Sequence, residues 1–166
     1  MYRLKAKDLM ATELITLDKS ETLDLADEIM RLARVRHLPV LDEGRLAGLV
    51  THRDILRAQV SALAGLSRDQ SRELEAKVPV TEIMTSGVRS VAPDTPAVEV
   101  ARLMRDHKFG CVPVVEGDRL VGIVTEADFL DLVVRALDDA APKATPTQRA
   151  GASATARGAT TRGATT

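Results

Sequence analysis

Two heptapeptides of the chain carry the same pair of polar side chains. Residues 48–54 read Gly-Leu-Val-Thr-His-Arg-Asp and residues 122–128 read Gly-Ile-Val-Thr-Glu-Ala-Asp, so a threonine precedes an aspartate by three positions in each. Both residue types cap helices through their side-chain oxygens, and one such pair would predict only a helix start. The pair occurs twice in the same context, at Thr51 with Asp54 and at Thr125 with Asp128. This doubling favours a site where a hydroxyl and a carboxylate bind a polar ligand.

The other reactive residue types form no recognisable catalytic or metal-binding motif. His37, His52, His107 and Cys111 lack the spacing of zinc-binding motifs, and we interpret His37 as partly buried and Cys111 as an inert thiol. Serine, histidine and aspartate show no known local triad arrangement, and no glycine-rich phosphate loop occurs. We therefore expect no enzymatic activity, no metal and no resident cofactor.

Both heptapeptides belong to a longer internal repeat. The triplet at 38–40, Leu-Pro-Val, recurs 74 positions later as Val-Pro-Val at 112–114, and the same shift aligns Met10 with Met84. The register holds over about fifty positions without a gap, which predicts that each copy is one supersecondary unit. The expected organisation is a first repeat over 7–63, a linker over 64–79, a second repeat over 80–137 and a tail over 138–166.

The elements that position each Thr-Asp pair follow the order β-α-β-β-α. In the first copy, residues 14–17 predict a strand, Ser20 an N-cap and the residues up to Ala33 a helix. Residues 37–41 and 45–51 predict a hairpin, and a helix is expected over 52–63. Each pair therefore stands where the hairpin passes into the last helix.

The second copy predicts a strand over 88–91, Thr95 as N-cap before Pro96 at the first helical position, a hairpin turn at 116–118 and a helix over 126–137. In the linker, Ser67 begins a capping box, and residues 68–77 are rich in helix formers. The tail consists mainly of Ala, Thr, Gly, Pro and Arg, which predicts disorder.

Composition excludes several functional classes. The hydrophobic fraction is 45% with 2% aromatic residues, which suits an α/β core of aliphatic side chains. The net charge is -1, and because residues 143–166 contribute four cations and no acid, the remainder carries -5. Nucleic acid is therefore not an expected partner. One cysteine, no signal-peptide pattern at the start and no long apolar run predict a cytoplasmic protein without a membrane span.

The repeat resembles the CBS domain family, and the tandem pair resembles a Bateman module. The resemblance covers roughly residues 7–137 and rests on the Leu-Met and Ile-Met starts at 9–10 and 83–84, on the Pro-Val triplets and on the two heptapeptides. It implies an α/β fold in which two repeats pack as a pseudo-two-fold pair around a cleft. Members of the family commonly bind AMP, ADP, ATP or S-adenosylmethionine there.

The resemblance also implies which residues line two nucleotide sites. The aspartate holds the ribose hydroxyls, since an ionised carboxylate accepts both hydroxyls of a cis-diol, and the threonine meets phosphate or ribose. Adenine would lie against the first strand and the Pro-Val strand. The first site then comprises Ile15, Thr16, His37, Leu38, Pro39, Thr51, His52, Arg53 and Asp54. The second comprises Arg89, Ser90, Cys111, Val112, Pro113, Thr125 and Asp128.

The two sites differ in charge. His52 and Arg53 separate the pair in the first copy, whereas Glu126 and Ala127 separate it in the second. A guanidinium attracts phosphate and a carboxylate repels it, so we expect the Asp54 site to bind the more highly charged nucleotide. The Asp128 site would be empty or would take a neutral or cationic adenosine compound, unless Arg36 of the other copy compensates.

These observations predict a regulatory protein that senses an adenine nucleotide and modulates an unidentified partner protein. By analogy with the family, it would form a homodimer through the helices at 52–63 and 126–137. The alternative is a scaffold protein that keeps the fold without a ligand.

Overall fold

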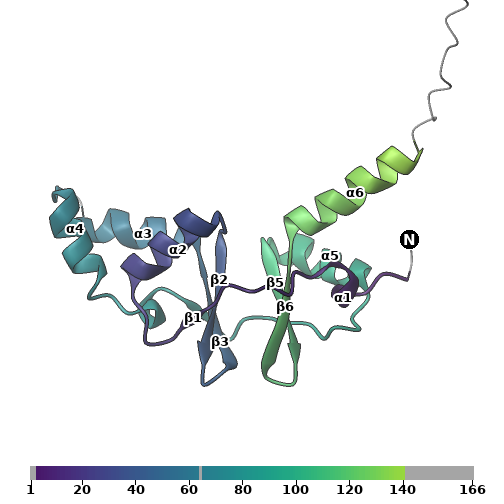
Figure 1. Cartoon of the computed structure of the whole chain (residues 1–166), viewed down its shortest axis with the longest axis horizontal. Coiled ribbons are helices and arrows are strands. Elements are labelled where there is room, and N and C mark those ends of the chain that lie inside the picture. Colours follow the sequence, from purple (N-terminus) through teal and green to yellow (C-terminus); the bar gives the residue numbers. More distant parts are fainter. Residues whose placement is uncertain (1–2, 64, 141–166) are drawn as a thin grey trace, which may run out of the picture.

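The protein is described by a computed structural model that covers residues 3–63 and 65–140. Figure 1 shows two lobes, each built on a β-hairpin that carries helices on its outer side. The elements of the first part are α1 (Ala6–Leu9), β1 (Leu17–Asp18), α2 (Leu23–Ala33), β2 (His37–Asp42), β3 (Arg45–Thr51), α3 (His52–Leu63) and α4 (Arg68–Glu75). Those of the second part are η1 (Val80–Glu82), β4 (Thr85–Ser86), α5 (Ala97–His107), β5 (Cys111–Glu116), β6 (Arg119–Thr125) and α6 (Glu126–Ala140).

The two hairpins have the same register and form one sheet. The strand order is β1-β2-β3-β6-β5, with β4 paired to β3, and the hairpins meet through a single pair, Arg45 with Arg119. The β2–β3 loop is two residues long, and Glu43 and Gly44 both have positive φ, 49° and 80°, as the tight turns that match strand twist require. The expected hairpins are confirmed in both copies.

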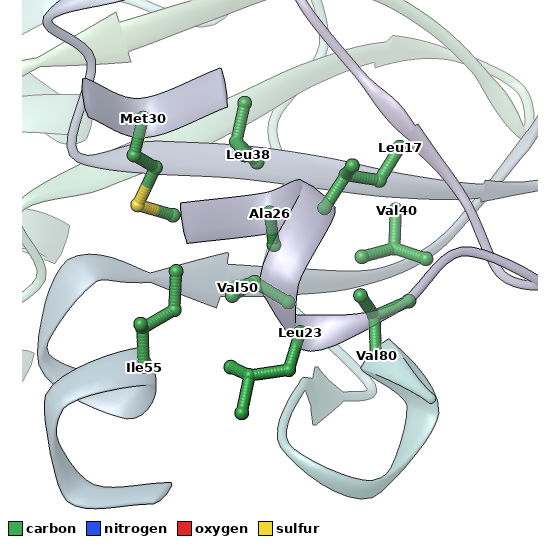
Figure 2. Close-up of a cluster of buried hydrophobic side chains, with 9 residues drawn as sticks. All are labelled: Leu17, Leu23, Ala26, Met30, Leu38, Val40, Val50, Ile55 and Val80. Atoms are coloured by element: carbon green, nitrogen blue, oxygen red, sulfur yellow. The ribbon is translucent and has the colours of Figure 1, made fainter. Parts of the chain in front are cut away.

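The first hairpin closes one hydrophobic core. Side chains from the inner faces of β2 and β3 meet the apolar stripe of α2, and β1, α3 and η1 complete the cluster (Figure 2). The alternation of strand side chains places Leu38 and Val40 inside, and helical spacing places Leu23, Ala26 and Met30 opposite them. The full cluster comprises Leu17, Leu23, Ala26, Met30, Leu38, Val40, Val50, Ile55 and Val80.

A second core lies under α5, and a third cluster joins the two hairpins. The second contains Val100, Met104, Val112, Val114 and Val124 together with Ala6. The third consists of Leu49, Cys111 and Ile123, with Leu14 and Val88 packed against it. The third cluster contains residues of β3 and of β6, so it joins the two lobes. It lies on the hairpin faces that point away from the first and second cores.

The start of each sequence repeat packs against the other repeat. Helix α1 contacts α5 and β6 of the second lobe (Figure 1), and the Ala11 amide donates to the Ile123 carbonyl over 2.9 Å. In the other direction, Val80 of η1 is fully buried in the first core, and its amide donates to the Glu21 carbonyl over 2.9 Å. The units that pack together are therefore not the contiguous repeats of the sequence.

The glycine of each heptapeptide makes this exchange possible. A Cβ on Gly48 would lie 2.5 Å from the sulfur of Met84, and a Cβ on Gly122 would lie 2.2 Å from the sulfur of Met10. Each methionine thus crosses to the other repeat and packs on a bare backbone position. Close approach of a second segment to the backbone explains why both positions hold glycine.

Several expected boundaries are corrected by the structure. The N-cap of α2 is Thr22, since Ser20 instead bonds through its hydroxyl to Asp18 over 2.6 Å, and Pro96 is the N-cap of α5. The first strand is reduced to Leu17–Asp18, and in the second copy only Val91 forms a bridge. Helix α4 ends at Glu75, and α6 continues to Ala140, into the expected tail. Residues 141–166 lie outside the described residues.

The linker helix begins as expected. Ser67 accepts a hydrogen bond from the Gln70 amide, and the Gln70 side chain accepts one from the Ser67 amide, which is the reciprocal capping box. Among the helices of residues 3–63 and 65–140, none is long and apolar enough to cross a membrane.

Candidate functional site

Both Thr-Asp pairs adopt the same geometry at the start of a helix. Asp54 Oδ2 accepts bonds from the Thr51 amide (2.9 Å) and from the Thr51 hydroxyl (2.5 Å), and Asp128 Oδ2 accepts from the Thr125 amide (2.6 Å) and hydroxyl (2.8 Å). In the first pair the Asp54 amide also donates to the Thr51 hydroxyl over 3.3 Å, which completes the capping box of α3, and the second pair shows the aspartate half of the same arrangement at α6. In the described part of the chain, neither Oδ1 receives a protein donor, so each half-buried carboxylate is held in place with one oxygen available.

The threonine of each pair lies opposite the first residue of the neighbouring strand, β2 in the first lobe and β5 in the second. His37 is the register partner of Thr51, and the His52 amide donates to the Arg36 carbonyl over 2.9 Å. Cys111 is likewise the register partner of Thr125 in the second lobe. The expected site residues of the Pro-Val strand thus lie next to the helix start that carries the aspartate.

His37 lies between the two lobes. Its ring packs on Gly110, where a Cβ would approach Nε2 to 2.8 Å. Burial lowers the pKa of His37, and Arg36 also lowers it, while the carboxylates of Glu126 and Asp54 oppose the shift. His37 is therefore neutral at neutral pH, and carboxylates of both Thr-Asp segments affect its pKa.

Cys111, the counterpart of His37, is a different kind of group. Its side chain is 4% exposed, and burial raises the pKa of the thiol to about 12. The thiol is therefore buried and protonated at neutral pH, which favours the interpretation of Cys111 as an inert thiol. Within the described residues, no group of three or more potential His, Cys, Asp or Glu ligands gathers as a metal site.

The residues expected to bind adenine differ in how far their side chains are exposed. Leu38 and Val112 are completely buried in the first and second cores, so at these two positions the backbone is the part that a ligand could contact. The remaining expected positions fall into three groups by exposure: Pro39 and Pro113 are buried, Thr16 is half-buried, and Ile15, Arg89 and Ser90 are exposed.

Arg89 is tied to a neighbour in its own lobe. Its Nη1 lies 3.0 Å from Nε2 of His107, and the His107 ring stacks on Phe109 with centroids 5.2 Å apart. The positions equivalent to these three in the first lobe are Ile15, Ala33 and Val35. The two repeats therefore differ at these positions as well as at the heptapeptides.

The structure also shows a hollow that the sequence analysis missed. It has a volume of about 350 Å³ and lies between the end of α2 and the start of α3. Of the expected site residues only His52 lines it, whereas Arg53 is exposed and does not. Its lining residues are Asp27, Met30, Arg31, Arg34, Val35, Arg36 and His52. Three arginines within positions 31–36 were the available sequence signal.

A smaller hollow of about 110 Å³ lies beside the second pair. It is lined by Asp8, Leu9, Asp128, Asp131, Leu132 and Arg135, and therefore joins α1 to the start of α6. Three of these six side chains are carboxylates, which does not favour an anionic ligand next to Asp128.

Comparison with known proteins identifies this arrangement. The model of the CBS domain matches the chain twice, over residues 6–61 and 80–135. The chain belongs to the CBS domain family. A CBS domain-containing protein of Dictyostelium discoideum is 32% identical over 143 residues, which are 85% of this chain and 99% of that protein.

Solved CBS structures share the fold. An acetoin utilization protein (AcuB) from Vibrio cholerae superposes with a TM-score of 0.73 at 35% identity, covering 84% of this chain and 98% of that one. The CBS domain pair of protein MJ0100, in complex with 5′-methylthioadenosine and S-adenosyl-L-methionine, gives 0.66 at 30% identity over 80% and 98%. CBSX2 in complex with AMP gives 0.66 at 26% identity over 80% and 98%.

Some relatives are enzymes, but the similarity covers a small part of them. The A-adding tRNA nucleotidyltransferase of Geobacter sulfurreducens is 34% identical over 125 residues, which are 13% of its length. Such matches relate this chain to the CBS region and carry no catalytic activity to it.

Proposed function

We propose that this CBS pair is a regulatory protein that binds an adenine nucleotide in the cleft between its repeats. The observation that carries the proposal is the preset Thr-Asp geometry, in which Oδ2 of Asp54 is occupied by Thr51 and Oδ1 has no donor from the described protein. A free carboxylate oxygen at a helix start can accept ribose hydroxyls through charge-assisted bonds. Known CBS pairs with S-adenosyl-L-methionine, 5′-methylthioadenosine and AMP support an adenosine ligand.

The two sites have different preferences in this proposal. The Asp54 site, with His52, Arg53 and the arginines at the end of α2 and just after it, takes the phosphorylated nucleotide, AMP, ADP or ATP. The Asp128 site has Glu126 in place of His52 and carboxylates in the adjacent hollow, so it takes an uncharged or cationic compound such as S-adenosylmethionine.

The regulated form is a homodimer in this proposal. Helix α6 extends away from the second hairpin (Figure 1), and none of its residues is buried. Four of its apolar side chains are 48–65% exposed: Leu130, Val133, Val134 and Leu137. Pairing of two copies through these helices would remove this surface from water. Ligand binding in the cytoplasm would then shift the dimer or its contact with a partner protein.

A thermal-unfolding series tests the ligand claim. A ligand that binds only the folded state raises Tm as its concentration rises, so AMP, ATP and S-adenosylmethionine are each added to wild type, Asp54→Asn and Asp128→Asn. AMP and ATP should stabilise wild type and Asp128→Asn but not Asp54→Asn. S-adenosylmethionine should lose its effect only in Asp128→Asn.

The second candidate function is a scaffold without a ligand. It is supported by the same bonds, because a carboxylate that caps its helix already has a structural role. If millimolar AMP, ATP and S-adenosylmethionine all leave the Tm of wild type unchanged, the scaffold replaces the sensor.

A further inference from the structure

The hollow between α2 and α3 has the composition of an anion site. Its walls carry three guanidinium groups, from Arg31, Arg34 and Arg36, and one carboxylate, from Asp27. His52, at the first residue of α3, adds an imidazole where the amide groups of the helix start favour negative charge. The net charge of the walls is therefore positive even with a neutral histidine.

None of the three arginines is committed elsewhere in the described structure. The ion pairs within residues 3–63 and 65–140 use other cations, and no side-chain hydrogen bond involves these guanidinium groups. Arg34 also occupies a left-handed position with φ of 56°, where glycine would fold with less strain. The charges of Arg31, Arg34 and Arg36 are therefore available to a ligand.

The equivalent positions of the second repeat do not form this site. Arg36 is matched by Gly110, His52 by Glu126 and Asp27 by Ala101, while Arg31 is matched by Arg105, which pairs with Asp106 over 2.8 Å. Two positive or titratable groups are thus replaced by a glycine and a carboxylate. The anion site is a property of the first lobe.

The hollow adjoins the Thr51–Asp54 pair. His52 lies between Thr51 and Asp54 in sequence, and its amide bonds to the carbonyl of Arg36. His37, the residue after Arg36, is the register partner of Thr51 and senses the charge of Asp54. The carboxylate proposed to bind ribose and the arginine hollow are therefore linked through His52 at the start of α3.

We propose that the α2–α3 hollow binds the polyphosphate of a nucleotide whose ribose is held by Asp54, with Arg31 and Arg34 as the residues that select ATP and ADP over AMP. This inference rests on the proposed nucleotide function and narrows it to nucleoside polyphosphates at the first lobe. Arginine is suited to this task because its planar fork donates two bonds to one phosphate group.

Calorimetric titration of ATP, ADP, AMP and adenosine tests the selection. The variants are Arg31→Gln and Arg34→Gly, which keeps the left-handed backbone, and the matched controls are Arg105→Gln and Lys108→Gly at the same positions of α5. Each hollow variant should weaken ATP about tenfold and AMP by less than about twofold, since a guanidinium–phosphate bond is charge-assisted. The controls should match wild type. An ATP-to-AMP affinity ratio that stays unchanged in both hollow variants overturns the inference.

Two further titrations separate this inference from the proposed function. Asp54→Asn should weaken ATP and AMP by the same factor and leave their ratio unchanged. If no adenosine compound binds wild type, the proposed function fails, and inorganic tripolyphosphate then tests the hollow alone. Tripolyphosphate binding that is lost in Arg31→Gln supports an anion site, whereas no binding to wild type overturns it.

Discussion

For each aspartate of the repeated heptapeptides, the sequence alone presents a capping role and the proposed ligand-binding role as alternatives. Asp54 caps α3 through Oδ2, and the bond from the Thr51 hydroxyl fixes its orientation. A carboxylate has two oxygens, so capping with one leaves the other for a ligand. The structural role therefore orients the proposed binding group instead of competing with it.

His37 makes the stability of the fold depend on pH. Its pKa is lowered from the ordinary value of 6.5 by burial and Arg36, against Glu126 and Asp54, so the unfolded chain binds the proton more readily than the folded one. Stability contributed by neutral His37 is present above about pH 6.5 and is lost as the pH falls toward the folded-state pKa. The loss in unfolding free energy between about pH 7.5 and pH 5.5 should be smaller in His37→Gln than in wild type.

Urea denaturation at the two pH values measures this difference. His107→Gln is the control, because that histidine is exposed and does not lie between the lobes. Equal pH dependence of wild type and His37→Gln would show that His37 does not titrate with folding.

Among the elements, the segment that begins each repeat packs on the other repeat through a methionine side chain that contacts a glycine, Met10 on Gly122 and Met84 on Gly48. Gly122→Ala should lower the unfolding free energy by about 1–3 kcal/mol, because the new methyl group overlaps Cβ, Cγ and Sδ of Met10. Shortening the methionine makes room, so the double variant with Met10→Ala should be more stable than the sum of the single effects predicts.

Denaturant unfolding of the four proteins of this cycle measures the coupling. The pair Gly48→Ala and Met84→Ala provides the matched cycle in the other lobe, where the Cβ would also approach the Thr85 carbonyl at 3.0 Å. Additive effects in both cycles, within about 0.5 kcal/mol, would contradict the exchange.

The sequence predicted most elements because their signals are local. The hairpins, the helix starts after Thr51 and Thr125 and the capping box at Ser67 follow from turn residues, alternation and caps within a few positions. The first strands were overestimated. Residues 14–17 and 88–91 are β-prone, yet only Leu17 and Val91 pair, because Leu14 and Val88 turn into the cluster between the hairpins.

In the molecule as a whole, α6 is the helix whose residues are all at least partly exposed. We expect Leu130→Glu to convert a dimer into a monomer with little effect on secondary structure, because Leu130 is 65% exposed and would lose only the contact with a second copy. Sedimentation velocity measures the change. Leu32→Glu, at a position 67% exposed on α2, is the matched control and should remain dimeric. A wild-type protein that is monomeric at all concentrations would contradict the dimer.

Long-range packing is what the sequence could not predict. A repeat pattern does not reveal which hairpin receives Met10 and which receives Met84, since either choice buries the same side chains. The arginine hollow likewise requires the end of α2 to lie beside the start of α3, and Arg31 and His52 are far apart in sequence. The Thr-Asp pairs were found from the sequence because each pair spans only four residues.

Calorimetric titration of ATP into wild type, Asp54→Asn and Asp24→Asn tests the central claim most directly. Asp24 is a fair control because it also accepts a threonine hydroxyl, from Thr22, at a helix start away from Asp54. We expect one saturable ATP site per chain in wild type and Asp24→Asn, and at least about tenfold weaker binding in Asp54→Asn. ATP binding that is absent from wild type, or that is unaffected by Asp54→Asn, would contradict it.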